Sequence, residues 1–321
     1  MALNIMFYNL ENLYDTSKDE VSDDEEFTPT GIKRWNAIKY QTKLANLSNV
    51  FAAVSGLPGG FPAIVGVSEI ENDTVLEDLL SQKRMEAANY RYVHYDSKDA
   101  RGVDVALFFR PDKFKLLGSE PVKLVLRSGR EYIGRDVLCV WGRLCDEMFC
   151  FYVCHFLSRR AGVSSSEGFR RAGAETVRDH ALMMRQKYPG IKIVVMGDMN
   201  DTPDEASLSV LLRARENIQN IDPLEYFNPM WSMMDDGLGT SVHNHEWTMF
   251  DNIIVSQNLL PVDAGYRDAK GLTLAKFDKQ YWGHVFQRSF MMKNGKPFRS
   301  YNGNVFSGGY SDHLPILVRL N

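Results

Sequence analysis

Residues 191–201 read IKIVVMGDMND, and this stretch sets the fold class of the chain. Its apolar, β-branched first half predicts a strand that is buried on both faces, as in the sheet of an α/β protein. The strand ends at Gly197, and Asp198 and Asn200 follow directly. Ligands of open α/β sheets bind at the carboxyl ends of strands, so these side chains predict a site. A simple turn is the alternative, because Gly, Asp and Asn are also common turn residues.

Composition gives the broad class of protein. The chain has 321 residues, of which 44% are hydrophobic and 24% are charged, as in a globular protein with a large core. It contains no Pro/Gly/Ser-rich linker and no internal repeat, so we expect one domain over residues 1–321. The formal net charge of −4 argues against a protein that coats nucleic acid without specificity, although a local basic groove is compatible with it. Charge therefore leaves the substrate open.

Cysteine usage and hydropathy bear on the compartment. The spacing of the four cysteines differs from the CxxC spacing of zinc sites, so we interpret them as buried thiols in adjacent strands, with a disulfide left open. No apolar run of about 18 residues is present, which argues against stable membrane insertion. Residues 1–9 lack the pattern of a signal peptide. We expect a cytoplasmic protein as the sequence stands, unless an export signal preceded it.

Other predicted strands also carry polar residues at their ends. Two apolar segments end at Asn9 and Glu69, a third ends at His155, and Asp312 with His313 precedes a final strand at residues 314–320. Each alone is explained by a turn, a helix cap or a surface ion pair. The joint pattern over five strands is not explained in that way, and it predicts one polar site at a sheet edge.

Helices are predicted between these strands. Apolar residues spaced three and four apart predict one helix over residues 40–54 and another after Ser165. Arg170 and Arg171 are assigned to the solvated face of the second helix. Asn72 is expected to cap a short helix, and a further helix is predicted after Pro203.

The residue types at the strand ends indicate the bound ion. Carboxylate and amide oxygens suit a hard cation, Mg²⁺ or Mn²⁺, better than zinc. Such an ion needs one or two protein carboxylates and takes substrate oxygens for the rest. Glu69 would supply one carboxylate. His155 is followed by Arg159 and Arg160, which could hold a phosphate.

Seven segments from one end of the chain to the other contain these residues: FYNLEN (7–12), GVSEIEN (66–72), RGVDVALFFRP (101–111), CHFLSRR (154–160), GDMND (197–201), FDNIIVS (250–256) and SDHLPI (311–316). In this order they resemble the motif set of the endonuclease/exonuclease/phosphatase superfamily, the deoxyribonuclease-like metal-dependent phosphohydrolases. Bacterial members that begin with an FNxEN-like strand are the most similar in pattern. The resemblance implies a four-layer α/β (α+β) sandwich, in which two mixed β-sheets lie face to face with helices outside.

The resemblance also implies roles for the metal-side residues. Glu69 would be the principal ligand of Mg²⁺ (or Mn²⁺), with Asn9 and Asp312 near the metal. Asp198 would orient or deprotonate the attacking water. Asn200 would fix the phosphate and the partners of the water.

Two histidines complete the implied set. His313 would contact a phosphoryl oxygen or transfer a proton, with Asp251 as its carboxylate partner. His155 would be a general acid or a phosphate ligand, with Asp104 as its partner on a neighbouring antiparallel strand. A histidine at this position leans away from the abasic-site endonucleases. Candidate substrate contacts are Arg101, Arg135, Arg159 and Tyr310.

The implied reaction is hydrolysis of a phosphate ester. A nuclease-type phosphodiesterase is ranked first, with DNA among the candidate substrates. The alternative is a phosphatase or phosphodiesterase acting on a small-molecule, inositol or lipid-derived phosphate. A non-catalytic phosphate-binding protein is less favoured, because the polar set is intact. We expect a monomer, and residues 231–246 are interpreted as a variable loop.

Overall fold

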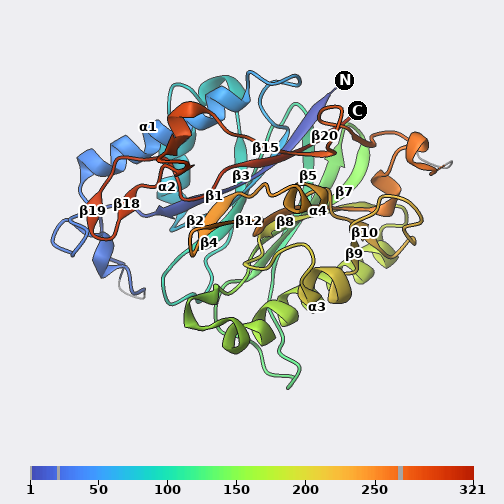
Figure 1. Ribbon diagram of the computed structural model, residues 1–321, viewed down its shortest axis with the longest axis horizontal. Coiled ribbons are helices and arrows are strands. Elements are labelled where there is room, and N and C mark those ends of the chain that lie inside the picture. The colour runs from blue at the N-terminus through green and yellow to red at the C-terminus, as the bar shows by residue number, and fades with distance from the viewer. Residues whose placement is uncertain (1, 20–21, 267–269) are drawn as a thin grey trace.

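The computed structural model describes residues 2–19, 22–266 and 270–321. Within these ranges, two mixed seven-stranded sheets form the centre of the molecule (Figure 1). The first has the order β14-β20-β1-β2-β4-β3, and β15 also pairs with β20. Its strands are β1 (Leu3–Leu13), β2 (Ile64–Ile70), β3 (Arg91–His94), β4 (Asp104–Phe109), β14 (Leu274–Ala275), β15 (Gly283–Val285) and β20 (Ile316–Leu320).

The second sheet contains most of residues 191–201, as strand β8. Its order is β5-β6-β7-β8-β13-β10-β9, with β7 and β8 parallel and β8 and β13 antiparallel. Its strands are β5 (Phe114–Val122), β6 (Val137–Leu144), β7 (Glu147–His155), β8 (Lys192–Asp198), β9 (Ala214–Arg215), β10 (Tyr226–Phe227) and β13 (Asp251–Ser256).

Helices and short hairpins lie outside this pair of sheets. Helices α1 (Ala37–Val54) and α2 (Asp73–Leu80) pack on the first sheet, and α3 (Val163–Lys187) packs on the second. No helix of the described residues is long and apolar enough to cross a bilayer. Other elements outside the sheets are α4 (Trp231–Asp235) and the hairpins β11 (Ser241–His243) with β12 (Glu246–Thr248), β16 (Met292–Lys293) with β17 (Lys296–Pro297), and β18 (Tyr301–Asn302) with β19 (Val305–Phe306), besides short 3₁₀ and π turns.

The core lies between the two sheets. Phe7 and Leu107 of the first sheet belong to one apolar cluster with Phe151 and Met196 of the second. A Cβ atom on Gly66 of β2 would lie 2.6 Å from the sulfur of Met196, so glycine permits this close approach. Two further clusters fill the spaces under the helices. The predicted four-layer α+β sandwich is therefore confirmed.

Several local predictions are also confirmed. The Asn72 side chain accepts a hydrogen bond from the backbone N–H of Val75 and caps α2. All four cysteines are free, and three are buried in β6 and β7 as predicted. Cys145 lies in the turn between these strands and is partly exposed, so the prediction is wrong for it. The helix predicted after Pro203 is only a π-helical turn, Ser207–Leu211, so that prediction is wrong in extent.

Arg170 of α3 contradicts its predicted place on a solvated face. It is 0% exposed, and its Nε donates to Asp201 Oδ1 at 2.5 Å. Its Nη1 donates to the hydroxyl of Ser166 at 2.5 Å. Helical periodicity missed this, because a buried charge with a paired carboxylate occupies a position that the pattern assigns to solvent.

Candidate active site

Strand pairing in the second sheet brings three titratable side chains together. The register of parallel β7 and β8 places His155 beside Asp198, and the register of antiparallel β8 and β13 places Asp251 beside Asp198. All three residues are buried. These three predicted site residues therefore lie together at one edge of the second sheet, on adjacent strands.

The first sheet contributes residues on an irregular backbone. Pairing of β1 with β2 shifts register after Asn9, and Glu11, Asn12 and Glu69 all have positive φ, at 52°, 51° and 61°. Such conformations are strained for residues other than glycine, and they cluster at functional sites. The Glu69 carboxylate accepts a hydrogen bond from the backbone N–H of Asn12 at 2.8 Å, which holds the two bends together.

One hydrogen bond joins the two sheets at this end. Asn9 Nδ2 donates to Asp198 Oδ2 at 3.1 Å, and Asn9 Oδ1 accepts from the backbone N–H of Glu11 at 2.9 Å. Both residues of the first pair are buried. Asn9 therefore fixes the position of the Asp198 carboxylate and does not itself line the cavity described below.

His313 enters the site from the loop before β20. Its Nδ1 lies 2.7 Å from Asp251 Oδ2, and its Nε2 lies 3.8 Å from Asp198 Oδ2. A β-bridge to Ser241 holds the backbone of His313. Burial alone would lower the pKa of His313, but the contact with Asp251 outweighs it and holds this pKa well above its ordinary value. The ring is therefore an imidazolium near neutral pH.

His155 has the opposite electrostatic environment. Its Nε2 lies 3.8 Å from both Glu69 Oε1 and Asp198 Oδ2, and its Nδ1 has no hydrogen-bond partner within the described residues. Burial and the nearby Arg135 hold the pKa of His155 well below its ordinary value, although Glu69 opposes this. The ring is therefore neutral.

The predicted partnership between Asp104 and His155 needs correction. Asp104 begins β4 of the first sheet and His155 ends β7 of the second, so they are not on neighbouring antiparallel strands. Asp104 accepts from the backbone N–H of Ser97 at 3.1 Å and lies 3.8 Å from His94 Nε2. The sheet to which each strand belongs cannot be recognised from local sequence.

The pKa values of the Asp198 and Glu69 carboxyl groups are shifted in opposite directions. Burial raises the pKa of Asp198 to about 6, with Asp251 adding to the effect and His313 opposing it. Burial alone would also raise the pKa of Glu69, but Arg101 and other positive charges hold it well below its usual range. Both groups are therefore mostly ionised at neutral pH.

The arginines predicted to contact substrate have different surroundings. Arg101 Nη2 donates to Asn12 Oδ1 at 2.5 Å and lies 3.5 Å from Glu69. Arg159 donates to the backbone carbonyl of Asn200 at 2.6 Å. Arg135 is buried and donates to Asp99 Oδ2 at 3.0 Å, so it acts on the site through its charge.

The site contains a cavity of about 180 Å³, called the site cavity below. Five of the predicted site residues do not line it: Asn9, Asp104, Arg135, Asp251 and Tyr310. The ring of Tyr310 packs against Phe290 and Phe298 instead. The predicted residues that line the site cavity are Glu69, Arg101, His155, Arg159, Asp198, Asn200, Asp312 and His313.

Sequence reasoning missed Arg299 in this cavity. Its Nη2 donates to Asp312 Oδ2 at 3.0 Å, and its Nε donates to the buried Glu11 at 3.3 Å. It follows a hairpin instead of an apolar strand, so no strand-end pattern marks it. Ser241 and His243, in the segment interpreted as a variable loop, also line the cavity.

The donor set fits a divalent cation. The carboxylates of Asp198 and Asp251 each place an oxygen within 4.8 Å of the other, and the charged ring of His313 beside them keeps no lone pair for a metal. Asp251 Oδ1 is buried without a hydrogen-bond partner in the described part of the chain. Glu69 Oε1 and Asp198 Oδ2 both lie 3.8 Å from His155 Nε2. Carboxylate oxygens of this kind bind hard cations.

The fold and the site together define a deoxyribonuclease-like metal-dependent phosphohydrolase. The Endonuclease/Exonuclease/phosphatase family matches residues 4–321, and the chain belongs to this family. Members of the family hydrolyse phosphate esters with a divalent metal, and this chain is an enzyme of that class. No curated protein matches the chain.

Solved structures share the fold at low sequence identity. Humanized TDP2 from D. rerio is 13% identical, with a TM-score of 0.59 over 100% of this chain and 99% of that chain. The catalytic domain of human Nocturnin with bound sulfate anion is 15% identical, with a TM-score of 0.59 over 100% and 94%. An endonuclease/exonuclease/phosphatase from Bacteroides vulgatus is 13% identical, with a TM-score of 0.58 over 100% and 99%. These similarities establish the fold alone.

Proposed function

We propose that this protein is a nuclease-type phosphodiesterase that uses Mg²⁺, or Mn²⁺ in its place, to cleave a nucleic-acid chain. The observation that supports an extended substrate is that three cavities adjoin one another and share lining residues. The site cavity shares Arg101, Arg160 and Arg299 with a neighbouring cavity of about 440 Å³. It shares Val242, Arg299 and Asp312 with another of about 550 Å³.

The charges along these cavities suit a polyanion on one side. The larger neighbouring cavity contains Lys293, Lys296 and Arg299, whereas Asp312 is the acidic residue of its lining. Basic side chains in a groove hold the phosphates that flank a scissile bond. The neighbouring cavity of about 440 Å³ has mixed charge, since Asp23 and Glu26 line it together with arginines. TDP2 from D. rerio, a protein of similar fold, has been solved in complex with single strand DNA product.

The chemistry is assigned to this chain's own residues. Asp198, with a pKa of about 6, accepts a proton from the attacking water, and Asn9 holds its carboxylate in place. His313, charged by its contact with Asp251, stabilises negative charge on the phosphoryl oxygens. Neutral His155 offers a hydrogen bond in the same cavity.

The metal is assigned mainly to Glu69, with Asp198 and Asp312 near it. When bound, Mg²⁺ neutralises phosphate charge and polarises the scissile ester. Glu69→Gln should weaken Mg²⁺ binding, measured by calorimetry, while the circular dichroism spectrum stays unchanged. Full hydrolysis in excess chelator would contradict the assignment.

A smaller substrate is the alternative. The formal net charge of −4 and the mixed charge of one cavity favour a phosphatase or phosphodiesterase acting on a small-molecule, inositol or lipid-derived phosphate. Both functions use the same site, so only substrate preference separates them. We further propose that residues 1–321 form a single domain that acts as a monomer.

One experiment tests the nuclease proposal. Hydrolysis of single-stranded DNA, plasmid DNA, sugar phosphates, inositol phosphates and bis(4-nitrophenyl) phosphate is measured with Mg²⁺, with Mn²⁺ and with chelator. The double variant Lys293→Glu and Lys296→Glu should lose about tenfold in kcat/KM on DNA, because phosphate contacts are removed, and little on the small diester.

The control variant is Lys115→Glu, an exposed lysine on β5 that lines none of these three cavities. It should keep activity on both substrates. Faster hydrolysis of a sugar or inositol phosphate than of DNA would show that the smaller substrate is the correct one.

A further inference from the structure

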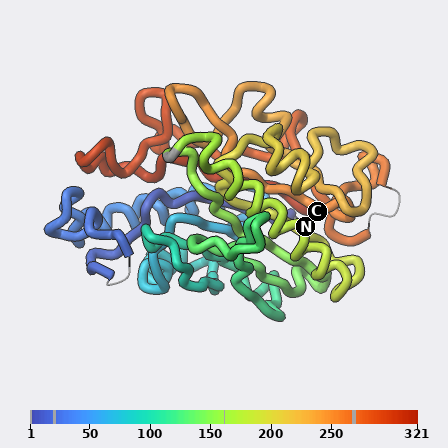
Figure 2. The backbone as a smooth tube through the Cα atoms, turned by 90° about the horizontal axis from the view of Figure 1, so that it is seen from below, coloured from blue at the N-terminus to red at the C-terminus, as the bar shows by residue number. Residues whose placement is uncertain are grey.

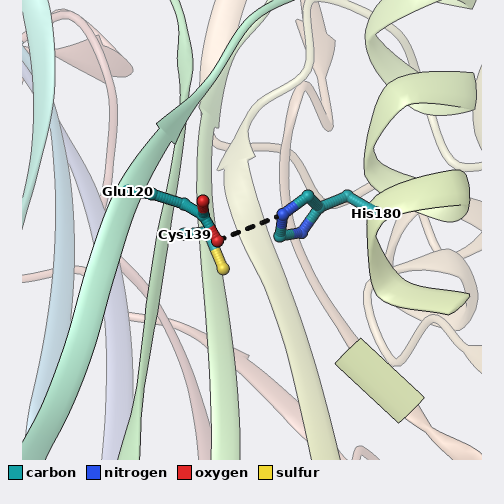
Figure 3. A group of neighbouring side chains, drawn as sticks. All are labelled: Glu120, Cys139 and His180. Atoms are coloured by element: carbon teal, nitrogen blue, oxygen red, sulfur yellow. Dashed lines mark ion pairs between the residues drawn. The ribbon is translucent and has the colours of Figure 1, made fainter. Parts of the chain in front are cut away.

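A second group of ligand-type side chains lies on the outer face of the second sheet. Glu120 on β5, Cys139 on β6 and His180 on α3 point toward one another (Figure 3). Each offers one ligand atom, and these atoms lie within 4.8 Å of one another. His180 Nε2 lies 3.3 Å from Glu120 Oε1. None of the three lines the catalytic cavity.

A fourth ligand-type atom lies beside Cys139, outside the set of three whose atoms are all within 4.8 Å of one another. Cys150 Sγ lies 3.5 Å from Cys139 Sγ. In the β6–β7 register, Cys139 is opposite Tyr152 and Cys150 is opposite Trp141, so the two thiols are diagonal neighbours on one sheet face. Both cysteines are free and 0% exposed.

His180 is held as metal-binding histidines commonly are. Its Nδ1 lies 2.9 Å from the hydroxyl of Tyr152. When Nδ1–H donates to that hydroxyl, the lone pair of Nε2 faces Glu120 and Cys139. Metal-binding histidines usually donate the second ring N–H to a protein oxygen, which fixes the tautomer and the ring orientation.

The surroundings give the site both closure and access. Cys139 and Cys150 belong to the apolar layer under α3, together with Val177 and Ala181. The Glu120 side chain is 48% exposed, so the group is open to solvent at one end. A cation can reach the thiols past Glu120, and the apolar layer closes the other side.

We propose that Glu120, Cys139 and His180, with Cys150 as a fourth ligand, bind a divalent transition-metal cation of the zinc type. Thiolate and imidazole ligands select Zn²⁺ over Mg²⁺, whereas the catalytic cavity offers mainly carboxylate oxygens. Binding displaces the thiol protons into solvent as metal–sulfur bonds form. The ion links β5, β6, β7 and α3, so its role is structural.

The spacing of these ligands explains why no motif revealed them. Zinc motifs place pairs of ligands a few residues apart on one hairpin or helix. Here the ligands come from four separate elements, and only the stacking of α3 on the sheet assembles them. The site is therefore a product of tertiary packing.

The test uses Co²⁺ as a spectroscopic substitute for Zn²⁺. Metal-free full-length protein is titrated with Co²⁺, and the ligand-to-metal charge-transfer absorption of Co²⁺–thiolate bonds is recorded. Wild type should show this band, and Zn²⁺ should abolish it by displacement. Cys139→Ser should lose the band, whereas Cys145→Ser, the matched control, should keep it. Tyr152→Phe should weaken Co²⁺ binding by roughly 10–100-fold.

Two further variants keep the proposal testable if Cys139→Ser does not fold. Glu120→Gln and His180→Gln change ligands nearer the surface, and each should weaken Co²⁺ binding while the circular dichroism spectrum is retained. Absence of a thiolate band in wild type would overturn the proposal. A mass and thiol count showing a Cys139–Cys150 disulfide in protein purified without oxidant would also overturn it.

Discussion

The two histidines of the site cavity differ in charge, one positive and one neutral. His313, before β20, and His155, at the end of β7, each place Nε2 3.8 Å from the same oxygen of Asp198. The pKa of His313 is raised and that of His155 is lowered. Asp251 contacts Nδ1 of His313, whereas Arg135 lies near His155, whose Nδ1 has no partner within the described residues. Proximity to a shared carboxylate therefore does not set the charge of a histidine; the sum of the charges around its ring does.

The largest loss of activity is expected when the shared Asp198 carboxylate or the charged His313 ring is removed. Asp198→Asn and His313→Ala should each reduce kcat by roughly 10²–10⁴-fold, because each removes a group assigned to proton transfer or charge stabilisation. The measurement is steady-state hydrolysis of the best substrate found with Mg²⁺. Asp235→Asn, an exposed surface change, is the control. Near wild-type kcat in either variant would remove the assigned role.

A smaller effect is expected when His313 is made to resemble His155. Asp251→Asn removes the carboxylate at Nδ1, so the pKa of His313 should fall and kcat should decrease by roughly 10–100-fold. NMR titration of the imidazole gives the pKa directly. Because the two residues act as a unit, Asp251→Asn combined with His313→Ala should cost little more than His313→Ala alone. Additive losses would show that Asp251 acts independently.

A smaller loss of activity is expected when His155, the neutral histidine, is changed. His155→Gln should lose about tenfold, the value of one hydrogen bond to a charged group, because a neutral ring supplies no charge. The loss should be equal for a diester with a poor leaving group and for bis(4-nitrophenyl) phosphate. A much larger loss with the poor leaving group would show that His155 protonates the leaving oxygen.

The smallest effect concerns a third histidine outside the site. Burial lowers the pKa of His284 to about 4 from 6.5, and its ring stacks on Phe277. As pH falls, the unfolded chain binds a proton on His284 at a higher pH than the folded chain does. The free energy of unfolding therefore decreases as pH falls from 6.5 toward 4. In His284→Phe this loss should be smaller by about 1 kcal/mol, measured by urea unfolding at several pH values. An identical pH dependence in both proteins would refute it.

Local pattern revealed the strand ends but not their partners. Glu69, Asp198 and His313 were found because apolar runs stop or start beside them. Arg299 was missed because it follows a hairpin, and Arg170 was misplaced because its periodicity does not show that Asp201 is buried next to it. The error at Asp104 has the same origin, since local pattern does not show that β4 and β7 belong to different sheets. The four-layer fold could be inferred because the family motifs extend over the whole chain.

The pairing of β1 with both β2 and β20 has a consequence for synthesis. Leu3 is opposite Leu320, and the two termini lie side by side in Figures 1 and 2. A ribosome makes the first strand long before its last neighbour, so β1 waits with one edge unpaired. His313 emerges at the same late stage as β20. A nascent chain that stops before Ser311 therefore lacks both the second neighbour of β1 and the imidazole that pairs with Asp251.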